Sequence, residues 1–285
     1  MSETKSEKLM PRRSALYMPC SNARALEKAA TIPADVLIFD LEDAVAPDSK
    51  TLARKQIVAA LANRNYGQRE RVVRINPVAG AWGYDDLKAL AAVPFDGLML
   101  PKVESLEQVN EALAILGHEM PVWVNIETPM GVLQVEKIVS HKSVAVVVMG
   151  TNDLAKEMRV RQSPSRAEFA YAFGRCLMVA RAFGCDILDG VYNQLDDESG
   201  FTSVCEQGKL LGFDGKTLIH PKQVEPANRI FMPGSAELDE ARALVAAWET
   251  SGKGGVLVVN GRLVEELHVV AARRLVAMAD RIANG

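Results

Sequence analysis

The stretch Val122-Trp-Val-Asn-Ile-Glu127-Thr-Pro-Met-Gly131 indicates the fold of this chain. Its apolar residues up to Ile126 are typical of a strand buried inside a parallel sheet. The strand has to end near Glu127, because Pro129 has no N–H to give to a sheet and Gly131 interrupts the pattern. Glu127 therefore marks the carboxyl end of a buried strand, where it either begins a solvated loop or takes part in a functional site.

The same theme recurs along the chain: a short apolar run, a polar or Gly/Pro break, and then a segment of helical periodicity. This alternation predicts an α/β fold with a parallel sheet. Eight strands are expected, which favours a closed TIM (β/α)8 barrel. The expected strands are Ala15–Met18, Val36–Asp40, Arg71–Ile75, Gly97–Leu100, Val122–Ile126, Val144–Met149, Asp186–Asp189 and Thr217–Ile219.

Polar residues that precede apolar-striped segments indicate where the helices begin. Ser105, with Gln108 three residues later, resembles a capping box, and Gly117 ends the same helix. The expected helices are Ala23–Ala30 after Ser21 or Asn22, Thr51–Asn63, Leu106–Leu116, a helix from Pro164-Ser165 to Ala182, one from Asp196 or Ser199 to Gly212, and Pro221–Phe231.

The barrel is expected to span residues 12–232, and residues 233–285 form an extension that a barrel does not need. The extension is expected to contain a helix over Ser235–Thr250, a Gly-rich link after Ser251, an apolar run Val256–Val259, a turn at Gly261 and a final helix from about Glu265 to Ala283. It is either a helical cap on its own barrel, or a lid or arm that closes a site in its own or a neighbouring subunit.

Composition excludes several classes of protein. With 285 residues and 48% hydrophobic content, the chain can bury a large core. A net charge of -3 gives no general attraction to nucleic acid or to an anionic membrane, and no apolar run has the length of a membrane-spanning helix. Four dispersed cysteines and the lack of a secretory signal predict a reduced, cytoplasmic protein.

Chemically active residue types gather where the expected strands end, which is the face on which TIM barrels carry their sites. Glu127 and Asp153 follow adjacent strands, so their carboxylates can converge on one hard cation. Mg²⁺, which prefers few carboxylates together with waters and substrate oxygens, is the metal we expect. Zinc is disfavoured, because the four histidines show no ligand spacing. The alternative for Asp153 is the N-cap of a helix.

Arg74 lies on an otherwise apolar strand, where a buried guanidinium requires an anionic partner. It either pairs with Glu42 or Asp43, or binds a substrate carboxylate beside the metal. Strand alternation separates Asp40 and Glu42 from Asp43, so these acids are expected to differ in role. We expect Glu42 to order water bound to the metal.

Lys28, Lys50 and Arg54 are candidates for binding phosphate near the rim of the barrel. The alternative for each is a solvated charge on the face of a helix. No Walker or GxGxxG motif accompanies them.

Taken together, these motifs resemble the citrate lyase beta-subunit family, which includes malyl-CoA lyases and belongs to the HpcH/HpaI aldolase superfamily. The resemblance covers nearly the whole chain, and the order and spacing of the motifs make it specific. The matching segments are Leu16-Tyr-Met-Pro, Asp40-Leu-Glu-Asp-Ala-Val-Ala-Pro-Asp48, Val73-Arg-Ile-Asn-Pro77, Leu100-Pro-Lys102, Ile126-Glu-Thr-Pro129, Gly150-Thr-Asn-Asp-Leu154 and Ile219-His-Pro-Lys-Gln223.

The resemblance implies that Glu127 and Asp153 hold Mg²⁺ and that Arg74 holds a small oxo acid or acyl carboxylate. Family members act on CoA thioesters, usually by aldol or Claisen chemistry and in some cases by hydrolysis. They form homotrimers or hexamers in which the C-terminal arm reaches a neighbour's active site. We therefore expect a Mg²⁺-dependent carbon–carbon lyase of a 3-hydroxyacyl-CoA of the malyl-, citramalyl- or citryl-CoA type. Its expected catalytic residues are Arg74, Glu42 and Glu265, and its expected substrate-binding residues are Arg74, Glu127, Lys28, Lys50 and Arg54.

The chain departs from the family pattern at Glu265. Lyases of the family carry an Asp in the arm, in a pattern like Gly-Lys-Met-Ile/Val-Asp-x-Pro, which protonates the enolate carbon; here the stretch is Gly261-Arg-Leu-Val-Glu265-Glu-Leu-His268. The added methylene moves the carboxylate by about a bond length, and a shift on the order of 1 Å costs roughly a hundredfold in rate. Glu265 is therefore either catalytic with a different substrate or only the N-cap of the final helix.

A second departure is Cys20, which stands where the family often has Gly. A small buried thiol is expected there, and Cys weakens the case for close approach of CoA phosphates. Three alternatives to the lyase stay open. They are a thioesterase in which Glu265 serves as base, an aldolase acting on a hydroxy-oxo acid without CoA, and a non-enzymatic subunit of a complex.

Overall fold

The computed structural model describes residues 9–251, 257–259 and 262–283. The chain forms two compact units, one of them Arg12–Phe231 and the other Met232–Gly285 together with Met1–Pro11.

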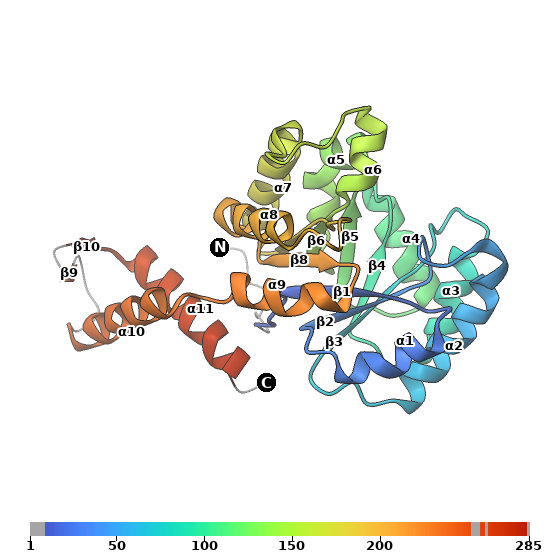
Figure 1. The fold of residues 1–285 in the computed structure, drawn as a ribbon, viewed down its shortest axis with the longest axis horizontal. Helices are drawn as coiled ribbons and strands as arrows, with labels where there is room; N and C mark the ends of the chain where they lie inside the picture. The colour runs from blue at the N-terminus through green and yellow to red at the C-terminus, as the bar shows by residue number, and fades with distance from the viewer. Residues whose placement is uncertain (1–8, 252–256, 260–261, 284–285) are drawn as a thin grey trace. The chain divides into compact units, whose positions relative to one another are not determined.

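The first unit is a closed barrel. Within Arg12–Phe231, every residue of which is described, eight parallel strands follow one another in sequence order and β8 pairs with β1 (Figure 1). The expected TIM-barrel architecture is therefore confirmed. The strands are β1 (Ser14–Pro19), β2 (Val36–Asp40), β3 (Glu70–Arg74), β4 (Gly97–Leu100), β5 (Val122–Ile126), β6 (Val144–Met149), β7 (Asp186–Asp189) and β8 (Gly215–Leu218).

The barrel strands are apolar on both faces, because one face fills the interior and the other packs against helices. The interior cluster includes Trp123, Met99 and Val148. A larger cluster joins the outer face of the strands to the surrounding helices. With both faces buried, polar groups that serve a function are left mainly to the strand ends.

Helices follow the strands and lie around the outside of the barrel (Figure 1). Two expected starts are confirmed, since Asn22 caps α1 and Gln108 Oε1 accepts a hydrogen bond from the Ser105 N–H at 3.0 Å. The helices are α1 (Ala23–Lys28), α2 (Lys50–Asn63), α3 (Gly83–Leu90), α4 (Leu106–Leu116), α5 (Pro129–Val139), α6 (Thr151–Met158), α7 (Ala170–Ala182), α8 (Glu198–Leu211) and α9 (Val224–Phe231).

The strand ends at Ile126, as predicted from Pro129 and Gly131, and a helix that was not predicted follows it directly. Pro129 is the first residue of α5, and the Thr128 hydroxyl caps this helix by accepting from the Gly131 N–H at 3.0 Å. Proline suits a first helical position, because its missing N–H is not needed there. The helix expected from Pro164 also begins later, at Ala170, after a 3₁₀ turn at Ala167–Phe169.

The second unit contains α10 (Ser235–Thr250), the short antiparallel strands β9 (Leu257–Val259) and β10 (Arg262–Val264), and α11 (Glu266–Ala283). The helices α10 and α11 pack together, and Trp248, Val264 and Val269 form a small core. The expected Gly-rich link after Ser251 and the turn at Gly261 lie outside the described residues. In the part of the chain that the structure describes, no helix is long and apolar enough to cross a membrane.

Candidate active site

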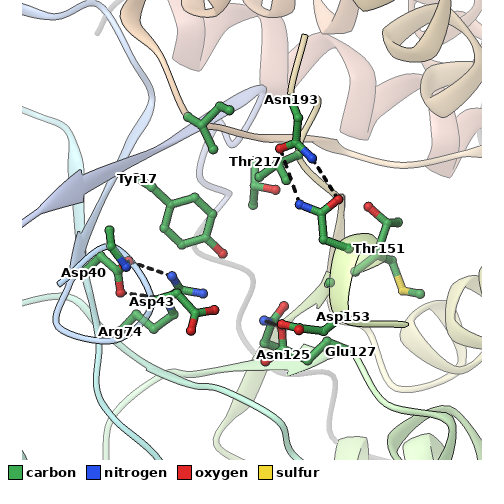
Figure 2. A pocket seen from close by; sticks show the side chains of 16 residues that line it. Tyr17, Asp40, Asp43, Arg74, Asn125, Glu127, Thr151, Asp153, Asn193 and Thr217 are labelled. Atoms are coloured by element: carbon green, nitrogen blue, oxygen red, sulfur yellow. Dashed lines mark hydrogen bonds and ion pairs between the residues drawn. The ribbon is translucent and has the colours of Figure 1, made fainter. Parts of the chain in front are cut away.

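A cavity of about 290 Å³ opens at the carboxyl ends of the barrel strands. Figure 2 shows the side chains of Tyr17, Arg74, Glu127 and Asp153 around it. The remaining lining residues come from β2, β5, β6 and β8, from the segments that follow β2, β6, β7 and β8, and from the first turn of α6. They are Asp40, Asp43, Ala44, Asn125, Met149, Gly150, Thr151, Asn152, Val191, Asn193, Thr217 and Ile219.

Arg74 is buried at the end of β3 and is held by three groups. Its Nε and Nη2 donate to the two carboxylate oxygens of Asp40 at 2.7 and 2.6 Å, and its guanidinium lies 4.5 Å from the centre of the Tyr17 ring. Its Nη1 lies 3.1 Å from Oε2 of Glu42. The principal partner is thus Asp40, which is paired with Arg74 in the β2–β3 register, whereas Glu42 is a second partner and Asp43 is exposed.

Glu42 is buried between two cations without lining the cavity itself. Lys102 Nζ donates to its Oε1 at 3.0 Å, while Oε2 accepts no hydrogen bond from the described residues. Burial raises the pKa of Glu42, and the charge of Arg74 opposes that rise. A buried carboxylate oxygen that is ion-paired with Arg74 but accepts no hydrogen bond favours the role expected for Glu42, which is to accept a hydrogen bond from an ordered water.

Glu127 comes directly after β5, and its side chain is only 3% exposed. Its Oε1 accepts from the Lys102 backbone N–H at 2.8 Å, and its Oε2 accepts from the Asn125 amide. Burial, with the charge of Glu42 adding to it, raises the pKa of Glu127 to about 8. The ionised form therefore requires a cation that the described side chains do not fully supply.

Gly150 makes room for this carboxylate. A Cβ built at Gly150 would lie 2.2 Å from Glu127 Cβ and 2.6 Å from its Oε2. These distances are too short for any residue other than glycine at this position. The backbone after β6 is thus shaped around Glu127, and the site is built into the fold.

Asp153 lies in the first turn of α6, and Gly150, not Asp153, is the N-cap of that helix. Its side chain is 29% exposed and lines the cavity, and its Oδ2 is 3.9 Å from Lys102 Nζ. The capping alternative for Asp153 is therefore not realised, and its carboxylate is available to a ligand.

The donors of this site fit Mg²⁺. The described residues include no group of three or more His, Cys, Asp and Glu side chains placed to hold a metal, which argues against a closed site of the zinc type. Mg²⁺ needs only one or two carboxylates, since it keeps several waters. When ionised, the buried or partly buried acids of the site carry four negative charges against two positive ones, a deficit that one divalent cation neutralises. The acids are Asp40, Glu42, Glu127 and Asp153, and the cations are Arg74 and Lys102.

Mg²⁺ binding is expected to strengthen as the pH rises toward about 8, by roughly tenfold per pH unit. The reason is that Glu127, as the expected ligand, has to lose its proton before it can bind a metal. The stability of the metal-free protein is expected to change with pH in the opposite direction. The contribution that protonated Glu127 makes to the free energy of unfolding is fully present below the usual pKa of 4.5. It is lost as the pH rises through about 8. Calorimetric titrations with Mg²⁺ on both sides of this pH test the expectation, and a flat affinity would contradict it.

Lys50 and Arg54 bind other groups of the protein, and neither lines the cavity. Lys50 is buried, and its ammonium donates to the carbonyl oxygens of Leu41 and Glu42 and to Asn76 Oδ1 at 2.7–2.8 Å. Arg54 pairs with Asp86 at 2.8 Å. These contacts favour a structural role for both over the phosphate-binding role expected from the sequence. Lys28 is exposed at the end of α1.

Two further residues bear on the departures from the family pattern. Cys20 is fully buried, and burial raises the pKa of its thiol, which favours the expected inert packing role. Glu265 is exposed in the second unit directly before α11, and its backbone N–H donates to His268 Nδ1 at 3.0 Å. Glu265 thus occupies the position directly before the first residue of α11, which is the position of an N-cap, and its backbone carbonyl accepts from the His268 N–H at 3.0 Å.

Three residues that contact the site had no role predicted from the sequence, namely Lys102, Tyr17 and Asn125. Lys102 follows β4 in the motif Leu100-Pro-Lys102, and Tyr17 lies near the carboxyl end of β1 in the motif Leu16-Tyr-Met-Pro. This position was the signal for both residues. Asn125 carried a weaker signal, as a polar residue inside the apolar run of β5.

Comparison with known proteins places this site in a family. A family model described as HpcH/HpaI aldolase/citrate lyase matches residues 13–221. The (3S)-malyl-CoA thioesterase of Cereibacter sphaeroides is 47% identical over 275 residues, which make up 96% of each chain. The citrate lyase subunit beta of Escherichia coli K12 is 33% identical over 287 aligned residues, 96% of this chain and 95% of the relative.

A solved structure agrees with these relatives. The protein CitE from Mycobacterium tuberculosis, in complex with magnesium, acetoacetate and coenzyme A, superimposes with a TM-score of 0.75 at 28% identity, covering 94% of this chain and 97% of CitE. The resemblance inferred from the motifs is thereby confirmed, and the chain belongs to the HpcH/HpaI aldolase/citrate lyase family.

Proposed function

We propose that this protein is a Mg²⁺-dependent thioesterase that hydrolyses the CoA thioester of a short 3-hydroxy dicarboxylic acid, of the malyl-CoA type. The observation that carries the proposal is the similarity to the malyl-CoA thioesterases, which extends over 96% of the chain and so includes the C-terminal extension. The sequence alone favoured carbon–carbon cleavage, and this full-length similarity reverses the order of the two reactions.

In the proposal, Glu127 and Asp153 hold the metal, and Asn125 and Glu42 hold the surrounding water. Bound Mg²⁺ would supply a Lewis acid that polarises a substrate oxygen. The uncharged Oδ1 of Asn125, buried and without a hydrogen-bond partner among the described residues, supports this use of the site. It gives an ordered water a second acceptor on the cavity wall.

Arg74 is proposed to bind the free carboxylate of the acyl group. Asp40 accepts hydrogen bonds from Nε and Nη2 only, while Nη1, near Glu42, lies outside hydrogen-bond geometry. A guanidinium that lines the cavity with N–H groups to spare suits an anionic oxygen of the substrate. The charge on Arg74 also selects a dicarboxylic acyl group over a neutral one.

Hydrolysis adds water to the thioester carbonyl and breaks the carbon–sulfur bond, so that the acid and the CoA thiol leave. The attacking water must lose a proton, and Glu265 is the base we propose, because its exposed carboxylate replaces the Asp of the lyases. The longer side chain is proposed to serve water instead of an enolate carbon.

Carbon–carbon cleavage of the same kind of substrate is the second candidate. It is supported by the 33% identity to a citrate lyase subunit beta and by the likeness to CitE, which was solved with acetoacetate and coenzyme A. Both reactions require the same metal and the same carboxylate site, so residues of the cavity alone do not distinguish them.

The family resemblance also leads us to propose a homotrimer or hexamer. Supporting this proposal, the second unit exposes apolar side chains that a subunit contact would cover. They are Val258, Leu263, Leu267 and Val270, each 60–71% exposed.

Release of free thiol from malyl-CoA tests the proposed function. In the presence of Mg²⁺ the purified protein is expected to release thiol with saturation kinetics, and a chelator is expected to abolish the release until Mg²⁺ is added back. Thiol release that a chelator does not affect would contradict the metal dependence. Absence of any turnover would contradict the choice of substrate.

A further inference from the structure

Lys102 contacts three carboxylates of the candidate site at once. Its ammonium donates to Glu42 Oε1 at 3.0 Å and lies 3.9 Å from Asp153 Oδ2, while its backbone N–H donates to Glu127 Oε1 at 2.8 Å. Two of these acids, Glu127 and Asp153, are the proposed metal ligands. The third is the proposed acceptor for metal-bound water.

The backbone of Lys102 is held in an unfavourable conformation to make these contacts. Its φ is +48°, and among the described residues only Arg159 and Arg166 share a positive φ without being glycine. A side chain in the left-handed region is retained only where surrounding structure fixes it, and such positions cluster at functional sites. Here the N–H bond to Glu127 is one of the contacts that fix it.

The charge of Lys102 also suits a site that must exist without its metal. Glu42 and Glu127 are buried, and two carboxylates beside Asp153 would repel one another if no cation lay among them. Lys102 is the described cation that reaches both Glu42 and Asp153. Its side chain is 37% exposed, so the ammonium has room to move when another cation arrives.

We propose that Lys102 is a positioning residue whose ammonium, lying between Glu42 and Asp153, holds these two carboxylates in the absence of Mg²⁺ and competes with Mg²⁺ for Asp153. This inference rests on the proposed metal site. It implies that the affinity for Mg²⁺ is set partly by the cost of displacing the ammonium from Asp153. If Lys102 only stabilised the fold, replacing it would not raise the affinity for Mg²⁺.

The test compares Mg²⁺ binding to three variants by calorimetry, without substrate. Lys102→Met is expected to bind Mg²⁺ at least about tenfold more tightly than wild type, because removing a unit charge within a few ångströms of a divalent cation strengthens its binding even in a water-like dielectric. Lys102→Arg, which keeps the charge, is expected to bind Mg²⁺ like wild type. Lys142→Met is the matched control, since Lys142 is 77% exposed and pairs with Glu119 on the surface.

Thermal melting gives a second readout. Metal-free Lys102→Met is expected to melt at a lower temperature than wild type, and saturating Mg²⁺ is expected to bring the two together. Unchanged or weaker Mg²⁺ binding in Lys102→Met, beside normal binding in wild type, would overturn the competition while leaving the proposed function intact. A wild-type protein that binds no Mg²⁺ would overturn the metal site and this inference together.

Discussion

Glu127→Gln is expected to abolish measurable Mg²⁺ binding and to lower kcat/KM by more than about 100-fold, beyond the loss typical of an outer partner of a metal ligand. The substitution nearly keeps the shape of the side chain that Gly150 accommodates, while it removes the charge and replaces one of the two hydrogen-bond acceptors by a donor. Because burial penalises that charge in the metal-free protein, the variant is expected to be at least as stable as wild type. Calorimetry, steady-state kinetics and thermal melting measure the three effects.

Glu119→Gln provides the matched control for this variant. Glu119 is 58% exposed and pairs with Lys142 at the surface, where an ion pair contributes little. It is expected to retain wild-type affinity for Mg²⁺ and wild-type kcat/KM. Retention of normal Mg²⁺ binding by Glu127→Gln would show that the metal site has been assigned to the wrong carboxylate.

Arg74→Met is expected to lower the free energy of unfolding by about 3–5 kcal/mol and to remove activity. The stability loss follows because Asp40, fully buried, would lose both of its hydrogen bonds from the guanidinium. Chemical denaturation measures the loss. A variant as stable as wild type would contradict the importance of this pair.

A second substitution separates the structural role of Arg74 from its proposed role in binding substrate. In Arg74→Met the buried Asp40 charge has no cationic partner, and adding Asp40→Asn removes that charge. The Asn side chain still offers an acceptor to the Glu42 N–H, which donates to Asp40 Oδ1 at 2.9 Å in the wild type. The double variant Arg74→Met/Asp40→Asn is therefore expected to regain much of the stability without regaining activity. Recovery of activity together with stability would mean that Arg74 acts only on the fold.

The barrel was predictable because each strand is a short apolar run closed by a polar or Gly/Pro break, and parallel strands buried on both faces require such runs. The start of α7 was mispredicted, and α5 was not predicted at all. Pro129 was interpreted only as a residue that cannot continue a strand, whereas the Thr128 cap makes it the first residue of α5. Arg166, with φ +53°, delays α7 in a way that the sequence does not reveal.

The site was predictable to the extent that its residues follow strand ends, as Glu127, Asp153 and Arg74 do. Partners across strands were harder. The pairing of Asp40 with Arg74 depends on the β2–β3 register, and spacing along the chain does not give that register. The sequence does not distinguish a Lys50 that binds a ligand from one that binds the protein. Only the hydrogen bonds from its ammonium to the carbonyl oxygens of Leu41 and Glu42 indicate a structural role. The position of Lys102 in the site depends on its left-handed backbone conformation, which a lysine in the sequence does not indicate.

The identity of the products formed from malyl-CoA in the presence of Mg²⁺ tests the central proposal most directly. Mass spectrometry of the reaction mixture is predicted to show free CoA and malate in equal amounts, as thioester hydrolysis requires. Acetyl-CoA and glyoxylate in place of these products would contradict hydrolysis and establish carbon–carbon cleavage instead.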